Sequence, residues 1–258
     1  MATSSAASIF FYDIPSKLPI ICWSPNLWKI RYALNFKGIP YTTVWVEYPD
    51  VEAKCKELGG APTTTKPDGS GRPHYTLPMI YDQSTGAVIT DSMNIVTYLD
   101  ATYPSLPRLM PPNTAGLQHA FDAAANALMT PIYPYVLPGA YKILNPRSAE
   151  YFGRTRKAKW GKPLEELTPR GAADEIEWKK LKDGFGKLDQ WIRVNGDGGK
   201  GKYLMGETVS YADLWIGSFL QSLKLILPER WDDVKTWHEG RWAGLLKDLE
   251  MYETGRQN

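Results

Sequence analysis

A proline-rich segment divides the chain into two parts whose hydrophobic patterns differ. Residues 103–112 contain four prolines, and such a density is typical of a connection between domains. Before this segment, short runs of apolar and β-branched residues alternate with helical patterns. After it, the clear periodicities have the three- and four-residue spacing of helices. The sequence therefore predicts an α/β domain at residues 1–103, a linker at 104–112 and an all-helical domain at 113–258.

The first part has the order of elements expected for a mixed sheet. A βαβ unit followed by a helix, a β-hairpin and a last helix gives parallel and antiparallel neighbours in one sheet. The gap of five residues in the hairpin, which includes a glycine, suits a short turn. The predicted elements are Ile9–Ile14, Pro25–Phe36, Tyr41–Tyr48, Val51–Leu58, Tyr75–Tyr81 with Ala87–Thr90, and a helix opened by Asp91 and Ser92.

The second part contains four strong helix candidates. They are Thr114–Met129, Arg170–Val194, Tyr211–Leu225 and Trp237–Tyr252. The clearest one has a single apolar stripe of Ile176, Leu181, Phe185, Leu188 and Ile192. Two further segments give weaker structural signals. Residues 131–138 hold three prolines and are expected to break or kink the preceding helix, and a basic cluster in residues 154–162 is expected to be a solvated helix end or loop.

Composition excludes several classes of function. With 30 Lys and Arg against 28 Asp and Glu, the net charge is +2, too small for a chain whose main partner is nucleic acid. No apolar run is long enough to span a membrane, and Met1–Ser8 lacks the basic and apolar regions of a signal peptide, so we expect a cytoplasmic protein. Two cysteines and three widely spaced histidines give no metal-binding motif, and no metal is expected.

The first candidate site lies where the first strand leads into the first helix. Ser24 followed by Pro25 is typical of a helix N-cap with proline at the first helical position. Ser24 is then either only a cap or a hydroxyl donor to an anion, since a helix start carries unpaired N–H groups and partial positive charge. Cys22 is a rival as a reactive thiol, but its position before the helix favours a buried, unreactive residue.

Two more candidate sites follow in the same domain. Leu77-Pro78 interrupts a predicted strand, and proline there indicates either an edge strand or a cis bond that exposes neighbouring backbone to an extended ligand. Asp91 and Ser92 open the last helix of the domain, either as caps or as partners for an ammonium and a carboxylate group. The anion beside Ser24 can be a thiolate. The three sites together then match a ligand with a thiol, a peptide backbone, a carboxylate and an amine, which are the groups of glutathione.

With these motifs, the chain resembles the glutathione transferase superfamily, and the resemblance extends from about Ile9 to Tyr252. The resemblance rests on the order of elements, on the motifs named above, on the proline-rich linker and on Met205–Asp213, which looks like the family's capping box. It implies a thioredoxin-like first domain that binds glutathione through Ser24, Leu77, Pro78, Asp91 and Ser92, with Ser24 as the catalytic residue. The segment Ser24–Arg31 is most similar to the fungal-specific, etherase-related class, which is related to bacterial lignin β-etherases.

The resemblance also implies an activity. The enzyme would activate the glutathione thiol for attack on small hydrophobic or aromatic electrophiles and peroxides, and would bind wood-derived phenolics between its domains; the family suggests a homodimer. The alternatives are a ligandin-type polyphenol-binding protein, a glutathione-dependent β-aryl ether cleaving enzyme, and a thiol reductase that uses Cys22. Lys66 and His74 are nearby candidates for the glycyl carboxylate. Residues expected to line the hydrophobic site are Pro25, Phe121, Ala125, Met129 and Tyr133.

Overall fold

The computed structural model describes residues 8–196 and 201–254. Its first part is a four-stranded sheet with strand order β2-β1-β5-β6, in which β1 and β2 are parallel and the other neighbours antiparallel. Two short strands, β3 and β4, form a separate hairpin. This confirms the expected thioredoxin-like domain with a mixed sheet. The elements are β1 (Ile9–Asp13), α1 (Pro25–Lys37), β2 (Tyr41–Trp45), α2 (Val51–Glu57), β3 (Thr64–Thr65), β4 (Pro73–His74), β5 (Met79–Asp82), β6 (Ala87–Thr90) and α3 (Ser92–Thr102).

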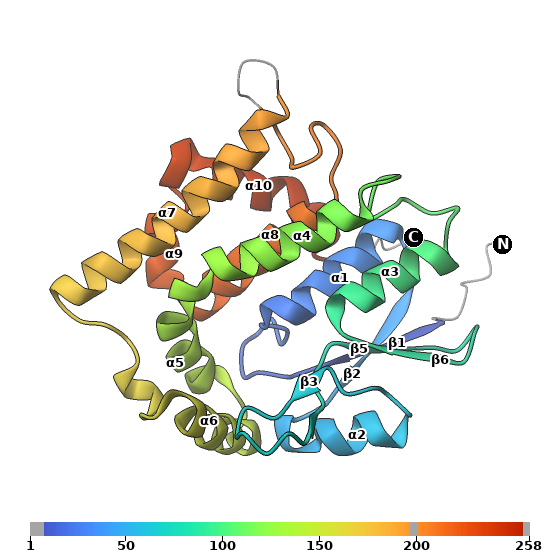
Figure 1. Ribbon diagram of the computed structural model, residues 1–258, viewed down its shortest axis with the longest axis horizontal. Coiled ribbons are helices and arrows are strands. Elements are labelled where there is room, and N and C mark those ends of the chain that lie inside the picture. The colour runs from blue at the N-terminus through green and yellow to red at the C-terminus, as the bar shows by residue number, and fades with distance from the viewer. Residues whose placement is uncertain (1–7, 197–200, 255–258) are drawn as a thin grey trace.

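The sheet is covered on both faces. Helices α1 and α3 lie side by side on one face and α2 lies on the other (Figure 1). Helix α1 is buried around most of its circumference because it also packs against the second domain through α8. It ends at Gly38, whose φ of 69° is the left-handed conformation that closes a helix with little steric cost. Its position between the domains makes its N-terminus a natural place for a shared site.

The second part is all-helical, as predicted. Its helices are α4 (Ala115–Leu128), α5 (Tyr133–Ile143), α6 (Pro146–Trp160), α7 (Ala172–Val194), α8 (Tyr211–Ile226), α9 (Pro228–Val234) and α10 (Trp237–Leu249). The proline-rich residues 131–138 do end the preceding helix, since α4 stops at Leu128, but a new helix, α5, then begins and continues through Pro138. One sequence expectation is wrong: Ile176 is 56% exposed, because it lies five residues before Leu181 and so outside the three- and four-residue spacing of the buried stripe on α7.

Helix α8 begins at the capping box expected from the sequence. The Asp213 carboxylate accepts a hydrogen bond from the Ser210 amide at 2.9 Å and another from the Leu204 amide at 2.8 Å. Val209 before the helix and Leu214 within it are both buried. The box therefore satisfies N–H groups at the start of the most deeply buried helix of the chain's described part.

A buried ion pair fixes the linker between the two parts. Lys37 at the end of α1 and Asp100 in α3 are both almost fully buried, and their charged atoms lie 2.8 Å apart. The Asp100 carboxylate also accepts hydrogen bonds from the amides of Leu109 and Met110, at 3.0 and 2.8 Å. Lys37 donates a second hydrogen bond to the Pro107 carbonyl. The proline-rich segment is therefore held against the first domain by paired charges.

Helix α6 forms a second connection between the parts. The loop after β2 donates a hydrogen bond from the Tyr48 amide to the Ser148 hydroxyl at 2.8 Å. Asn145 donates to Glu47 at 2.7 Å, and Arg147 pairs with Asp50 at 2.9 Å. These polar contacts hold α6 beside the first domain, near α2 and the β3–β4 hairpin (Figure 1).

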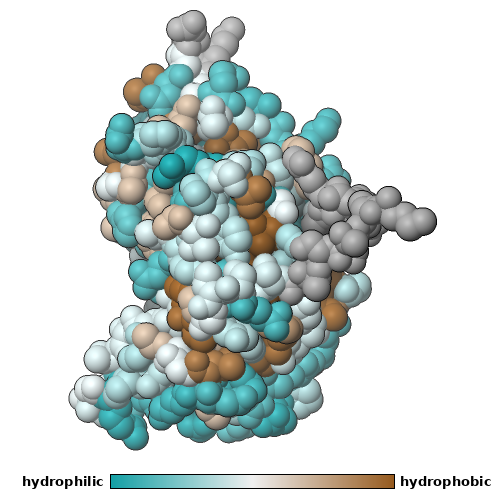
Figure 2. Space-filling model, turned by 90° about the vertical axis from the view of Figure 1, so that its right-hand side faces the viewer, coloured by the Kyte–Doolittle hydropathy of each residue, from teal (hydrophilic) through white to brown (hydrophobic). Residues whose placement is uncertain are grey.

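The face of the molecule that carries α3 shows little extended hydrophobic area. In Figure 2, the face that carries the sheet edge and α3 is largely hydrophilic, with brown side chains in separate patches. Large exposed hydrophobic residues are scattered along the chain instead of forming one region. No helix in residues 8–196 or 201–254 is both long and apolar enough to cross a bilayer.

Candidate functional site

Ser24 occupies the N-cap position of α1 but does not cap it with its side chain. Its φ and ψ of −75° and 133° are extended, Pro25 follows at the first helical position, and its hydroxyl makes no capping hydrogen bond. The Ser24 carbonyl accepts the first backbone hydrogen bonds of the helix, from Leu27 and Trp28. Because the hydroxyl is not used by the helix, it is available to a ligand at the positive end of α1.

The Leu77–Pro78 peptide bond is cis. Of the two explanations left open by the sequence, the edge strand is wrong, since β5 begins at Met79 and has β1 and β6 as neighbours on its two sides. Leu77 and Pro78 precede the first paired residue of β5. The backbone of Leu77 is thus outside the sheet ladder and adjacent to its end.

Asp91 is the N-cap of α3 and has an unusual backbone. Its φ is 75°, a left-handed value that is rare for residues other than glycine and often marks a functional site. Its Oδ1 atom accepts hydrogen bonds from the amides of Met93 and Asn94, and its own amide donates to the Pro78 carbonyl at 3.3 Å. Ser92 is the first residue of α3, where unpaired N–H groups favour an anion.

The strand register brings these three segments to one end of the sheet. Met79 pairs with Tyr12 on one side and with Thr90 on the other. Pro78 precedes Met79 and Asp91 follows Thr90, so both leave the sheet beside the last residues of β1. The chain then runs from β1 through a loop to Ser24. Pro78 and Asp91 therefore lie together at this end of the sheet, joined by the hydrogen bond from the Asp91 amide to the Pro78 carbonyl.

Helix α1 also carries a buried lysine, which faces the helical domain. Lys29 in α1 is 2% exposed, and its Nζ atom is 3.7 Å from the Asp122 carboxylate and 4.9 Å from the centre of the Trp215 ring. Burial lowers the pKa of Lys29 to about 8, while the negative charges of Asp122 and Asp91 oppose that shift. Sequence reasoning did not single out Lys29; its signal was a charged residue between the apolar Trp28 and Ile30.

Two neighbouring cavities lie beside the N-terminus of α1. The smaller, about 80 Å³, is lined by Pro25 and by residues of α4, α5 and α8, including Ser222, whose hydroxyl has no partner within the described chain. The larger, about 660 Å³, lies between the β3–β4 hairpin and helices α5 and α6. Asn26 and Tyr133 line both cavities, so the two lie side by side at the first residues of α1, which follow Ser24 in the chain.

Only part of the predicted hydrophobic lining is present. Pro25 and Tyr133 line the cavities. Phe121, Ala125 and Met129 line neither one; each is at most 7% exposed. The ring of Phe121, for example, packs edge-on against two tryptophans of the helical core. Spacing along a helix identified the inward face of α4 but did not show that other helices cover it.

The larger cavity is lined by residues that the sequence indicated and by residues that it did not. Both Lys66 and His74, the candidates for the glycyl carboxylate, line the larger cavity. Helix α6 contributes Arg154, Arg156 and Lys159 from the basic cluster that was expected to be simply solvated. Nothing in a single sequence indicated that this cluster would face the first domain.

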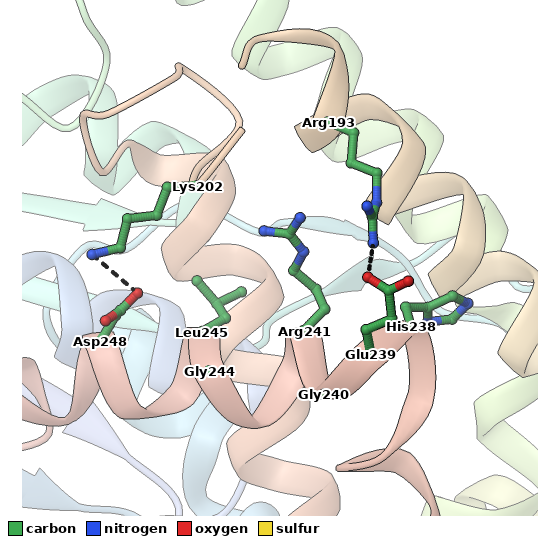
Figure 3. Close-up of a pocket in the computed structure, with 9 residues that line it drawn as sticks. All are labelled: Arg193, Lys202, His238, Glu239, Gly240, Arg241, Gly244, Leu245 and Asp248. Carbon is green, nitrogen blue, oxygen red and sulfur yellow. Dashed lines mark hydrogen bonds and ion pairs between the residues drawn. The ribbon is translucent and has the colours of Figure 1, made fainter. Parts of the chain in front are cut away.

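A third cavity of about 310 Å³ lies elsewhere, between α7, α10 and the segment before α8 (Figure 3). Figure 3 shows two ion pairs among its charged side chains, Lys202 with Asp248 and Arg193 with Glu239. None of its lining residues belongs to the segments around Ser24, Leu77 or Asp91. We therefore place the candidate site at the first two cavities.

Within residues 8–196 and 201–254, no three His, Cys, Asp or Glu side chains gather as metal ligands.

Cys22 is buried, and burial raises the pKa of its thiol to about 11. The thiolate is therefore a negligible fraction at neutral pH, and thiol chemistry requires the thiolate. We expect native protein at pH 7.5 to leave Cys22 unmodified by a maleimide or by glutathione disulfide, whereas unfolded protein reacts fully. Intact-mass measurement with peptide mapping checks this, and a glutathione adduct on Cys22 of native protein would restore the thiol-reductase alternative.

Comparison with known proteins agrees with this geometry. Residues 23–102 match the family described as glutathione S-transferase, N-terminal domain, and residues 116–252 match its C-terminal domain. The chain is 35% identical to the glutathione S-transferase-like protein ustS of Aspergillus flavus, over 95% of this chain and 91% of that protein.

Solved structures of two fungal proteins are also similar to this chain. The glutathione S-transferase CsGST63524 of Ceriporiopsis subvermispora, crystallised with glutathione, is 44% identical, with a TM-score of 0.90 over 97% of this chain and 100% of that one. Glutathione transferase GSTFuA3 of Phanerochaete chrysosporium is 43% identical, with a TM-score of 0.90 over 97% and 99%. The fold, both domain matches and the full-length relatives agree: the chain belongs to the glutathione S-transferase family.

Proposed function

We propose that the protein is a glutathione transferase in which Ser24 activates the glutathione thiol. The observation that carries this proposal is the Ser24 hydroxyl, which is left unused by α1 at the positive end of that helix, beside a cavity. A thiol of ordinary pKa, about 8.5, is mostly protonated at neutral pH. A hydrogen bond from Ser24 and the dipole of α1 both favour the thiolate.

The other segments would hold the rest of glutathione. The backbone of Leu77, next to cis-Pro78, would pair with the cysteinyl peptide. Ser92 and the start of α3 would bind the γ-glutamyl carboxylate, and Asp91 the ammonium group. The glutathione bound in the Ceriporiopsis relative supports the ligand; the role of each residue is part of the proposal.

The second substrate would lie in the two cavities. Pro25 and Tyr133 keep their proposed role there, and the aromatic side chains of α5 and α6 favour planar ligands. We propose small hydrophobic or aromatic electrophiles, peroxides and phenolics of the kind released from wood, in line with a fungal-specific, etherase-related class. Likeness to that class also supports a homodimer.

A direct assay separates an enzyme from a binding protein. We expect glutathione-dependent conjugation of chlorodinitrobenzene, with rates that saturate in glutathione, and binding of glutathione measured by calorimetry. Tight phenol binding without any turnover of chlorodinitrobenzene, a hydroperoxide or an aryl ether would instead establish the ligandin-type alternative. Release of a phenol from a model β-aryl ether would assign the ether-cleaving activity.

A further inference from the structure

The larger cavity has more positive charge than bound glutathione requires. Its only carboxylate among the described lining residues is Asp68. Glutathione would place one anionic group here, its glycyl carboxylate, because its γ-glutamyl end is assigned to α3. The cavity wall carries six basic side chains, namely Lys66, Arg72, His74, Arg154, Arg156 and Lys159.

Half of these side chains already have a carboxylate partner. Lys66 pairs with Glu52 at 2.8 Å, Arg72 with Asp68 at 3.0 Å, and Arg154 with Glu150 at 3.3 Å. Arg156 and Lys159 differ, since neither has a carboxylate within 4.0 Å in the described part of the chain. Two cations of α6 therefore face the cavity without a protein counter-charge.

The guanidinium of Arg156 is held by aromatic rings instead of by a carboxylate. Its carbon lies 4.3 Å from the centre of the Phe152 ring and 5.5 Å from that of Tyr48. It also donates a hydrogen bond to the Thr155 hydroxyl at 3.0 Å. Stacking restricts the orientation of the guanidinium while leaving donors for a ligand, and a guanidinium binds carboxylates in a bidentate manner.

The pKa of His74, which lines the cavity from β4, is affected by the same positive charges. Its pKa is lowered by burial and further by the charges of Arg156, Lys66 and Lys159. His74 is therefore mostly neutral at pH 7, and the cavity is positively charged because of its lysines and arginines. A negatively charged ligand would relieve the repulsion among these groups.

Aromatic side chains complete the same wall. The rings of Tyr133 and Trp160 both line the cavity, and their centres lie 6.5 Å apart at a tilted angle. Tyr151 lines it as well and stacks on Tyr48. Flat apolar surface beside unpaired cations matches a ligand that combines a ring with an acidic group.

We propose that this cavity selects acidic aromatic molecules, with the ring against Tyr133 and Trp160 and a carboxylate on Arg156 and Lys159. The inference rests on the proposed function, because it names the class of second substrate or ligand for that site. Acidity is the specificity-determining property, and neutral phenolics of the same shape bind more weakly.

A pair of ligands with nearly the same shape tests the charge preference. Para-benzoylbenzoate carries a carboxylate, and para-benzoylbenzamide replaces it with a neutral amide. We expect calorimetry to show the carboxylate binding about 10-fold tighter to the wild type, with or without saturating glutathione. Raising the ionic strength should weaken only the carboxylate ligand.

Two substitutions on the same helix locate the preference. Arg156→Gln should remove it, leaving the affinity for the amide unchanged, whereas Arg154→Gln removes an arginine already paired with Glu150 and should retain it. Equal affinities of the wild type for both ligands, insensitive to salt, would overturn the proposal. So would an Arg156→Gln variant that keeps the preference but binds glutathione more weakly, because Arg156 would then hold the glycyl carboxylate.

The outcome is independent of the proposed enzymatic activity. Conjugation of chlorodinitrobenzene reports thiol activation, whereas the ligand pair reports the charge of the cavity. A protein that prefers the carboxylate but conjugates nothing would keep the inference and refute the transferase proposal. A protein that conjugates but shows no preference would do the reverse.

Discussion

Replacing Ser24 by alanine should raise the pKa of the bound glutathione thiol by one to two units and lower kcat/KM at pH 6.5 by about 10- to 100-fold. A hydrogen bond to a charged group is worth about 1.5–3 kcal/mol, and one pKa unit corresponds to about 1.4 kcal/mol. The Ser24 hydroxyl makes no capping bond that competes with this role. The ultraviolet absorbance of the bound thiolate, measured against pH, gives the midpoint directly.

The activity lost in Ser24→Ala should depend on pH in a definite direction. A wild-type midpoint below 8.5 means that the thiolate forms at lower pH, so the loss in Ser24→Ala should be largest at acidic pH and shrink as pH rises above the variant's midpoint. Ser24→Thr, which keeps a hydroxyl, is the matched variant and should retain a lowered midpoint. An unshifted midpoint in the wild type would remove Ser24 from the catalytic role.

The free energy of unfolding of Ser24→Ala tests whether the Ser24 side chain also caps α1. Loss of a serine whose side chain caps a helix costs about 0.5–2 kcal/mol. Since the Ser24 side chain makes no such bond, we expect Ser24→Ala to change the free energy of unfolding by less than about 0.5 kcal/mol. A larger loss in urea titrations would indicate that the side chain does support the start of α1.

Replacing Asp100 by alanine should have the largest effect on stability, a loss of about 3–5 kcal/mol in the free energy of unfolding. The substitution leaves the Lys37 ammonium buried without its partner and removes the acceptors of two linker amides. Breaking one side of a buried pair is costly because the remaining charge is uncompensated. Urea titration of the full chain measures the loss.

A surface pair provides the control for Asp100. Glu57→Ala breaks an equally short pair with Lys54, at 2.6 Å, but both side chains are substantially exposed, so the loss should stay below about 1 kcal/mol. Asp100→Asn, which keeps the shape and one acceptor oxygen, should fall between them and serves if Asp100→Ala does not fold. Equal losses for Asp100→Ala and Glu57→Ala would contradict a structural role for the buried pair.

Local signals in the sequence predicted much of the fold. The Ser24-Pro25 start of α1, the Ser210–Asp213 capping box and the four long helices depend on neighbouring residues, and all appear in the structure. The helix predicted from Trp237 is interrupted near its start, where His238, Glu239 and Gly240 have positive φ values. The prediction was weakest where distant segments meet. A proline pattern did not reveal that α5 continues through Pro138, because packing around a helix can override local preference.

In the candidate site too, the residues predicted from the sequence are those with local signals. Ser24, Pro78 and Asp91 each leave a mark in the sequence because each requires a particular backbone conformation. The α6 side chains that line the larger cavity and the buried Lys29 require no special backbone conformation, so no sequence motif indicates them. Their positions follow from how α6 attaches to the loop after β2 and how α1 packs on α8, which depends on the tertiary fold as a whole.

The attachment of α6 has a consequence for how the site can change. Helix α6 carries the cationic wall, and it is joined to the first domain by side chains of the loop after β2. The strands and helix starts that would position glutathione lie in other segments. If the proposed roles hold, ligand selection and thiol activation would be separable traits, and substitutions on α6 would change the range of accepted compounds without changing the residues proposed to activate the thiol.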